Sequence, residues 1–560
     1  MSQGILALLA VLPLAAIFIL TVNLRWSATR AMPVAFGVTL ILALVFWGTP
    51  LNWILAACVN GVMGMLKILL IVLGALILLF TLKESGALGV INHGFSTISP
   101  DRRIQTIIIA WMFGSFIEGA SGFGVPGAIV APLLLSLGFP ALAAVIVGII
   151  ANTTCIPFGT VGTATLIGIG TTLNTPEVLT DLANSGMDYS SFIHQIGAWS
   201  AVLHALPGIF MPLIMVVTLT RFFGENRSFK EGLEIWPYAI FAGTCFVIPY
   251  VAVAILLSPE FPTLLGSLIG LLILIPLTKR GFLAPKKVWD FAGKDKWTSE
   301  WNSSITISET LTDKKISLAK AWAPYAFIVL ILVITRVNFF PFGAWLKSIK
   351  LSIPQMFGTT VTSELDFLNN PGVFPFLPIA LLCIPFFGIT KKQAFLAWSE
   401  VARRIKAPLI SLLFAVPMVQ IMIISGTNSK DFLSMPLAMA QFMESVFQNA
   451  WPVVGTFVGA LGAFMSGSTT VSNMLFSLFQ YSIADNLGIS HIIIVSLQNV
   501  GGSFGNMINV QKIITACAVV GLTGVEGLII KRTIIPMTLA ILISGIVGMI
   551  LIFFIVPGLF

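Results

Sequence analysis

The chain has 560 residues, of which 57% are hydrophobic and only 9% are charged, and its mean hydropathy is +1.00. A soluble protein of this length carries roughly 25% charged residues, so the composition excludes a soluble globular protein. Many apolar runs reach the ~20 residues needed to cross a bilayer, which indicates a polytopic membrane protein. We expect the net charge of +8 to reflect basic cytoplasmic loops, with no nucleic-acid partner.

The five cysteines are scattered through apolar segments without metal-binding spacing. They predict neither a disulfide framework nor a metal site, and no cofactor is expected. The first apolar run, 5–22, has no basic stretch before it and no small-residue cleavage site after it. It is therefore predicted to be a retained first span and not a signal peptide.

The first third of the chain begins with predicted spans at 5–23, 31–49 and 68–82. Residues 52–66 are apolar but are interrupted by Asn60, Gly61 and Gly64, so we expect an interfacial helix there. The only long polar segment, 279–320, carries nine Lys or Arg and is predicted to be a solvated cytoplasmic linker. Beyond the segments discussed next, spans are predicted at 192–220, 238–258, 261–278, 322–337, 373–389, 407–425 and 532–557.

Residues 114–162 set glycines, prolines, polar side chains and one carboxylate, Glu118, in an apolar background. Broken backbone at membrane depth requires protein or a water-filled cavity around it. We predict a re-entrant hairpin at 104–137, with its tip at 118–124, and a broken helix at 139–173, with its break at 152–163. The alternative is a glycine-rich face for helix packing, which explains glycine and serine but not Glu118 or Asn152.

The same order of features recurs in the second half of the chain. GSFIEG at 114–119 matches GAFMSG at 462–467, and Phe158-Gly159 matches Phe504-Gly505. The repeat predicts a second hairpin at 452–485, with its tip at 466–473. It also predicts a second broken helix at 489–528, with its break at 498–509.

The charge pattern places the two halves in opposite orientations. If the N-terminus is outside and both hairpins return to the side they entered from, 24 of the 30 Lys and Arg are cytoplasmic and the acidic loop 174–191 is outside. The exceptions are Lys67, Arg336, Lys347, Lys350, Lys430 and Lys512. The chain then divides into a first inverted repeat (1–221), a two-helix insert with the basic cytoplasmic linker (222–321) and a second inverted repeat (322–560). Both termini are expected outside.

The predicted fold is an all-α polytopic membrane protein with about 12 transmembrane helices and two re-entrant hairpins. Inverted repeats with broken helices in corresponding positions indicate a secondary transporter with its site near the midplane. Broken helices present N-termini with a partial positive charge, which suits an anionic substrate group. Any one neutral side chain could instead only link helices. The expected substrate-binding residues are Ser121, Gly122, Asn152, Thr153, Thr154, Ser468, Thr469, Thr470, Asn473, Asn499, Gly501, Gly502 and Asn506.

Glu118 is the expected proton-coupling residue. A carboxylate at membrane depth is costly unless it is protonated or paired, and burial favours its protonated form. The alternative role for Glu118 is structural, as a carboxyl hydrogen-bonded to the hairpin tip. His204 lies in the middle of a predicted span and could relay a proton, or be a core histidine with its hydrogen bonds satisfied.

Four motifs resemble the lactate permease family, which imports lactate and glycolate with protons. They are GSFIEGASGFGVPGAI at 114–129, NTTCIPFGTVG at 152–162, GAFMSGSTTVSNMLFSLFQ at 462–480 and NVGGSFGNMINVQKI at 499–513. The family pattern implies an aspartate where this chain has Thr469 and a lysine where it has Asn506. The plan is also similar to the wider ion-transporter superfamily, whose members are dimers that work by an elevator motion, so the resemblance implies a homodimer.

These observations predict a proton-coupled symporter of a small monocarboxylate, lactate or glycolate, in the lipid bilayer of the cytoplasmic membrane. Sodium coupling is the alternative, because carbonyls at broken helices can hold Na⁺. A channel is a third option, although inverted repeats favour alternating access. An intramembrane enzyme would need a Ser–His pair, an Asp–Asp pair or a metal cluster, and four widely spaced histidines provide none of these.

Overall fold

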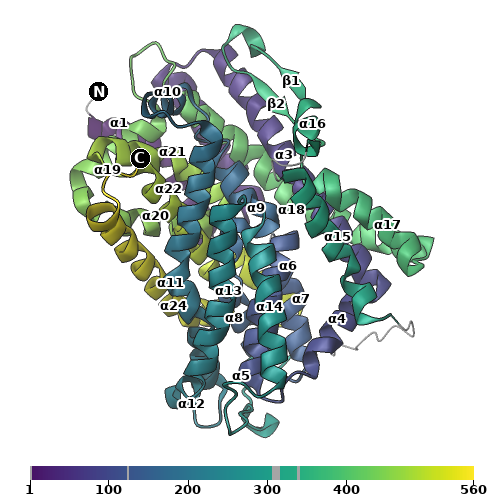
Figure 1. Cartoon of the computed structure of the whole chain (residues 1–560). Helices are drawn as coiled ribbons and strands as arrows, with labels where there is room; N and C mark the ends of the chain where they lie inside the picture. The colour runs from purple at the N-terminus through teal and green to yellow at the C-terminus, as the bar shows by residue number, and fades with distance from the viewer. Residues whose placement is uncertain (1–2, 25, 123–124, 305–315, 337–340) are drawn as a thin grey trace.

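The computed structural model describes residues 3–560 apart from 25, 123–124, 305–315 and 337–340, and nearly all of this part is helical (Figure 1). Three predicted segments lie partly outside the described residues: the first tip at 123–124, the linker 279–320 at 305–315, and the span 322–337 at its last residue. Ten helices in the described ranges are long and apolar enough to cross a membrane, or eleven if one bent pair is a single span. The protein is therefore multi-pass, with slightly fewer spans than the sequence predicted.

In the first half of the chain, four helices precede a hairpin, and a broken helix follows it. The helices before the hairpin are α1 (Gln3–Phe18), α2 (Ala28–Ile41), α3 (Leu51–Ser85) and α4 (Ala87–Ser96). The hairpin is made of α5 (Arg102–Gln105), η3 (Thr106–Phe113), α6 (Gly114–Ser121) and α7 (Val125–Ser136). The broken helix and its sequel are α8 (Ala141–Ala151), η4 (Ile156–Phe158), α9 (Gly159–Thr163), η5 (Ala164–Ile169), α10 (Pro176–Ser185) and α11 (Tyr189–Phe223).

An insert follows the first half, and the second half then repeats the plan of a hairpin and a broken helix. The insert holds α12 (Phe229–Leu233), α13 (Trp236–Leu256) and α14 (Pro262–Lys279). After the linker come α15 (Leu318–Arg336), α16 (Phe342–Ser348), strands β1 (Leu351–Ile353) and β2 (Ser363–Leu365), η9 (Gly372–Phe376), α17 (Leu377–Phe387), α18 (Lys391–Ile424) and α19 (Met435–Phe447). The chain ends with α20 (Trp451–Ser466), α21 (Thr469–Leu487), α22 (His491–Gly505), η11 (Asn506–Ile508), α23 (Val510–Ala518) and α24 (Glu526–Ile550).

Helix α3 corrects the expectation of an interfacial helix at 52–66, because it continues without interruption over 35 residues. Its glycines allow another helix to approach. A Cβ on Gly61 would lie 2.4 Å from the Cα of Pro417 in α18, and a Cβ on Gly74 would lie 1.9 Å from the carbonyl oxygen of Gly372. Glycine at these positions permits close packing of backbones, as is common between membrane helices.

The predicted spans at 373–389 and 407–425 also have different bounds. Residues Gly372–Phe387 form a short apolar helical segment, whereas α18 is a continuous helix of 34 residues that begins at Lys391. Thr390 and Gln393 start α18 with reciprocal side-chain and backbone hydrogen bonds. The capping pair explains why this helix begins well before its apolar part.

The two halves pack on each other in a reciprocal pattern. Helices α3 and α18 lie against one another at the centre of this arrangement. Helix α2 packs on α18 while α17 packs on α3, and α1 packs on α19 while α15 packs on α4.

Both hairpins return to the end at which they began, as the sequence predicted. The Arg102 guanidinium at the start of the first hairpin donates a 2.6 Å hydrogen bond to the carbonyl of Leu137 at its finish. In the second hairpin, Trp451 at the start donates to Gln480 on the returning helix, at 2.8 Å. The first hairpin opens toward the end of the molecule that carries α5 and α12, and the second opens toward the opposite end (Figure 1).

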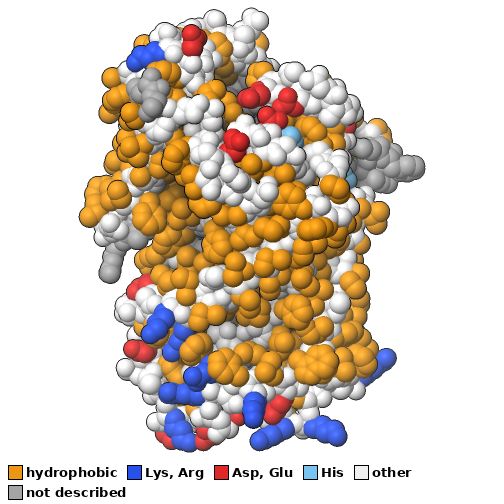
Figure 2. Space-filling model, turned by 90° about the vertical axis from the view of Figure 1, so that its left-hand side faces the viewer, with side chains coloured by type: hydrophobic (Ala, Val, Ile, Leu, Met, Phe, Trp, Pro, Cys, Tyr) orange, Lys and Arg blue, Asp and Glu red, His pale blue; other side chains and the backbone are white. Residues whose placement is uncertain are grey.

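Charged side chains lie mainly at the two ends of the molecule, on either side of a broad hydrophobic band (Figure 2). In this view Lys and Arg gather at the lower end, and most Asp and Glu side chains at the upper end have no Lys or Arg beside them. Two of the cations that break the pattern lie beside carboxylates. Lys67 lies 3.8 Å from Asp366, and Arg336 lies 3.2 Å from Glu260.

The linker is less solvated than predicted over its first part. Trp289 and Trp301 are buried, and the backbone N–H of Trp289 donates to Asp101 at 3.1 Å. Asp101 is also paired with the buried Arg103 at 2.8 Å, and Arg103 in turn donates to the carbonyl of Lys287. This segment therefore covers the end of the first hairpin.

Candidate functional site: a cavity between the hairpin tips

A cavity of about 390 Å³ lies where the two hairpin tips meet α3 and α18. Both tips contribute to it, as do the first break, the start of α23 and the two long helices. Both tips and the first break therefore meet at one cavity, whereas none of the described residues of the second predicted break, 498–509, lines it. Its polar and charged lining residues are Glu118, Thr160, Thr163, Arg403, Arg404, Ser411, Ser466, Ser468, Thr469, Thr470, Gln511, Lys512 and Thr515.

The first tip is seated directly on the first break. A Cβ on Gly122, whose φ is +58°, would lie 1.4 Å from the hydroxyl of Thr160, so only glycine fits there. Three consecutive residues, Thr160–Gly162, are in the left-handed conformation, with φ of 47°, 54° and 75°. Such backbone is strained for β-branched residues and is found mostly at functional sites. The break thus lies within the predicted range 152–163.

Glu118 faces the cavity from the last turns of α6. Its side chain is only 3% exposed, and its Oε2 has no hydrogen-bond partner among the described residues. Asn152 lies within hydrogen-bonding range of the carboxyl, and Lys512 acts on it through its charge. Gly159 gives the carboxyl room, because a Cβ there would lie 2.8 Å from Oε1. Glu118 and Asn152 are therefore neighbours in the structure, although Glu118 was predicted for proton coupling and Asn152 for substrate binding.

The second tip presents the N-terminus of α21 to the same cavity. Ser468 caps this helix by accepting a hydrogen bond from Val471 N–H. Thr469 donates to the carbonyl of Gly502 at 3.0 Å and accepts from the amide of Asn506 at 2.7 Å. Ser468, Thr469 and Thr470 thus line the cavity, and Gly502 and Asn506 lie directly behind them.

Asn473 and Asn499 link the two halves behind the tips. The Asn473 amide donates to the carbonyl of Ala164 at 3.0 Å and to Asn499 at 2.9 Å. Asn499 donates to Thr165 and Ser200, at 2.9 and 3.1 Å. These residues hold the first broken helix to the second hairpin, and neither lines the cavity.

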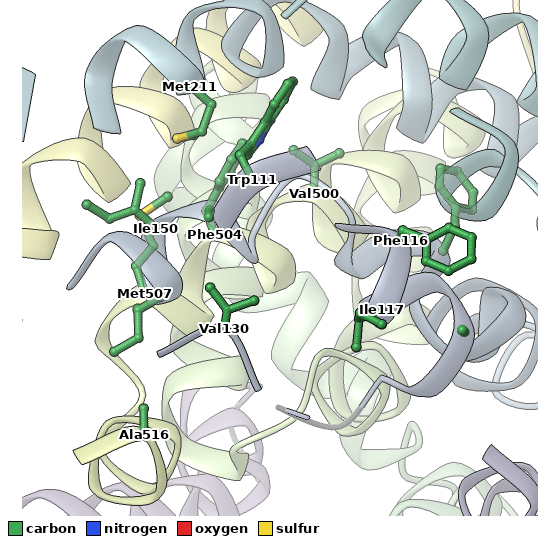
Figure 3. Packing of buried hydrophobic residues seen from close by; sticks show 14 of the residues in the cluster. Trp111, Phe116, Ile117, Val130, Ile150, Met211, Val500, Phe504, Met507 and Ala516 are labelled. Carbon is green, nitrogen blue, oxygen red and sulfur yellow. The ribbon is translucent and has the colours of Figure 1, made fainter. Parts of the chain in front are cut away.

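The remaining predicted residues lie away from the cavity. Ser121 donates to the carbonyl of Ile117, and Thr153 to that of Ile150. Thr154 accepts a 3.4 Å hydrogen bond from the indole of Trp111. His204 bonds to the hydroxyl of Ser503 at 2.9 Å and stacks on Phe504, with ring centroids 4.4 Å apart. Figure 3 shows Trp111 and Phe504 in the hydrophobic core behind the site, together with Ile150 and Met211.

The second break is later and shorter than the predicted 498–509. Helix α22 is continuous to Gly505, and the interruption covers only η11 and Asn509. The glycines before it serve packing: a Cβ on Gly501 would lie 2.0 Å from the carbonyl of Thr456, and one on Gly505 would lie 2.2 Å from that of Ala460. Here the glycine-rich packing face, which was the alternative for the first stretch, is the correct interpretation.

The cations that line the cavity were not among the site residues predicted from the sequence. Lys512 was noted only as an exception to the charge pattern, and Arg403 and Arg404 only as cytoplasmic charges. Arg403 and Arg404 both pair with Glu400, at 3.0 and 2.7 Å. The signal available in the sequence was a lysine in an apolar stretch, three residues after the predicted break 498–509.

A second, larger cavity of about 1030 Å³ lies on the other side of the first break. Val161 and Thr163 line it, so Thr163 borders both cavities. Glu177 lies at its margin on α10, outside the spans. Burial raises the pKa of the Glu177 carboxyl, and the charges of Asp181 and Asp485 raise it further. The left-handed turn Thr160–Gly162 thus separates two cavities that extend toward opposite ends of the molecule.

Comparisons with known proteins identify the family of this chain. The family model described as L-lactate permease matches residues 6–555. A putative L-lactate permease of Haemophilus influenzae is 29% identical, over 96% of this chain and 94% of its own length. The glycolate permease GlcA of Escherichia coli is 25% identical, over 95% of this chain and 93% of its own. A solved structure, the YdaH transporter of Alcanivorax borkumensis, is similar with a TM-score of 0.41 and 14% identity, over 86% of this chain and 84% of the other. Because the family model covers almost the whole sequence, the chain belongs to the L-lactate permease family.

Proposed function

We propose that this protein is a secondary active transporter that carries lactate or glycolate together with a proton across the cytoplasmic membrane. The observation that carries the proposal is Glu118, a buried carboxyl that faces a polar cavity between two hairpin tips and whose Oε2 has no hydrogen-bond partner among the described residues. The names of the relatives supply the substrate class, a small 2-hydroxy monocarboxylate.

A co-transported proton solves the electrical problem of this substrate. A monocarboxylate anion that enters alone moves negative charge against an inside-negative potential, which costs ~2.3 kcal/mol per 100 mV. A proton carried with it makes the step neutral. Glu118 is the only carboxylate among the residues that line the smaller cavity, which makes it the proposed carrier. His204 lines neither cavity, so we assign it no role in the relay.

We propose alternating access around the first break. The two cavities on either side of Thr160–Gly162 support this scheme, because a shift of the tips and breaks against α3 and α18 could open one cavity and close the other. The moving unit would contain both hairpins and both broken helices. The reciprocal packing of the two halves supports the inverted repeats 1–221 and 322–560, with 222–321 as the insert between them.

The charge distribution supports the orientation. The end that carries Arg102, Arg103 and the linker would face the cytoplasm, and both termini would face outward. The smaller cavity, with Arg403 and Arg404, would then open inward. A homodimer that forms through the scaffold spans is part of the proposal by analogy with the superfamily, and crosslinking in native membranes tests it.

The test is uptake of labelled lactate or glycolate by the purified protein in sealed liposomes. A proton gradient and a sodium gradient are imposed separately, each with the other ion at equilibrium. The proposal expects accumulation with the proton gradient alone. Accumulation with the sodium gradient alone would replace proton coupling with sodium coupling, and no uptake of either acid would contradict the substrate assignment.

A further inference from the structure

We infer that Lys512 binds the carboxylate of the substrate, and that this contact makes protonation of Glu118 a condition of transport. The inference rests on the proposed function and deepens it. It assigns a residue from the second broken helix to the substrate and a residue from the first hairpin to the proton.

Lys512 occupies the first turn of α23, at the edge of the cavity. Asn509 caps this helix by accepting a hydrogen bond from the Lys512 N–H at 2.9 Å. The amide of Asn509 also donates to the carbonyl of Phe464 at 2.9 Å, which fixes the start of α23 to the second hairpin. Gln511 and Thr515 line the cavity beside Lys512. The start of α23, which carries Lys512, is therefore held to the hairpin whose tip carries Ser468 and Thr469.

The surroundings of the cavity favour an anion near Lys512. The N-termini of α21 and α23 both border it, and each carries a partial positive charge. A helix end alone does not make a site. Here the buried Glu118, with its unpartnered Oε2, supplies an independent sign of a ligand position. Arg403 and Arg404 already share Glu400, so Lys512 is the lining cation whose electrostatic partner is Glu118.

Charge counting then couples the two ligands. In the empty site the Glu118 carboxylate and the Lys512 ammonium cancel. A lactate anion that takes the ammonium as its partner leaves two carboxylates beside one cation at membrane depth, where a net charge is costly. One proton on Glu118 restores neutrality. Glu118 is then an uncharged carboxylic acid, and the Lys512 ammonium pairs with the bound lactate anion. Counted over Glu118, Lys512 and the substrate, the loaded and empty states are both neutral, so one proton accompanies each substrate molecule.

The experiment compares Lys512→Gln, Lys512→Arg and a control, Lys531→Gln, in liposomes. Lys531 is exposed on α24. A hydrogen bond to a charged group is worth enough that its loss weakens binding at least about tenfold. We expect Lys512→Gln to raise the half-saturation concentration for lactate by at least about tenfold, in accumulation and in exchange at equal pH. Lys512→Arg should recover part of the loss, and Lys531→Gln should match the unmodified protein.

Binding without transport gives a second measurement if Lys512→Gln is poorly active. Sodium L-lactate, compared with sodium chloride, should raise the thermal unfolding midpoint of the unmodified protein and of Lys531→Gln, but not that of Lys512→Gln. Unchanged half-saturation and an unchanged lactate-dependent shift in Lys512→Gln would overturn the inference while the proposed function stands. Absence of uptake by the unmodified protein would overturn the proposed function, and the inference with it.

Discussion

The amide of Asn506 donates a 2.7 Å hydrogen bond to the hydroxyl of Thr469, and both side chains are buried. The bond joins the second hairpin tip to the end of α22. These are the two positions at which the family pattern implies an aspartate and a lysine. Thr469 and Asn506 are in direct contact, so the two departures from the family pattern belong to one interaction. A neutral hydrogen bond replaces the ion pair that the pattern implies.

This contact predicts that charged residues are tolerated at positions 469 and 506 only when both are introduced together. Thr469→Asp alone, or Asn506→Lys alone, places an uncompensated charge in a buried contact and should destabilise the protein by about 3–5 kcal/mol. The double variant should recover most of that loss. Thermal unfolding of the four proteins in detergent, analysed as a double-mutant cycle, measures the coupling. Additive losses would show that the two side chains do not interact.

Glu118→Gln should abolish accumulation of lactate driven by a pH gradient while leaving exchange of lactate at equal pH. Glutamine keeps the shape and polarity of the side chain but cannot gain or lose a proton. Glu300→Gln, at an exposed position in the linker, is the matched control and should accumulate lactate normally. If Glu118→Gln liposomes still accumulate lactate under the pH gradient, the Glu118 carboxyl is structural and another group carries the proton.

Gly122→Ala should destabilise the first tip and slow transport. The added Cβ would lie 1.4 Å from Thr160 Oγ1 on a backbone with φ of +58°. Overpacking and a strained backbone together cost about 1–3 kcal/mol or more. Gly89→Ala in α4 is the control, because nothing lies within 4 Å of its added Cβ. Unfolding midpoints and initial uptake rates test the difference, and equal values for the two variants would contradict it.

Cysteines placed in the two cavities should react from opposite sides of the membrane. Thr515 lines the smaller cavity, and Thr171 lines the larger one. Cys58 is replaced by Ser first, because it is the only native cysteine that is not buried. A membrane-impermeant maleimide should label Thr171→Cys from outside and Thr515→Cys from inside. Substrate should change the two labelling rates in opposite directions. Labelling of both positions from the same side would contradict alternating access around the first break.

The sequence by itself determined the membrane class, the two hairpins and the side to which each returns. Apolar length and the positions of Lys and Arg are enough for this, because the bilayer imposes both independently of side-chain packing. The repeat of GSFIEG and GAFMSG located both tips. Where glycines interrupted an apolar run, however, the sequence did not distinguish a break from a contact. Gly61 and Gly501 lie in continuous helices. Glycine is present at these positions because a side chain would collide with Pro417 or Thr456 of a neighbouring helix.

Only the tertiary structure decided which residues share the cavity. It placed Lys512 near Glu118, although the two residues are far apart in the chain. It also showed that His204 lies outside the cavity, where it bonds to Ser503, which in turn donates to the carbonyl of Thr153. It also joined Thr469 to Asn506, so that two substitutions became one interaction. Composition and spacing cannot predict such pairs. They depend on how closely the hairpin tips approach the breaks, and that distance is set by glycine contacts between helices that are remote in sequence.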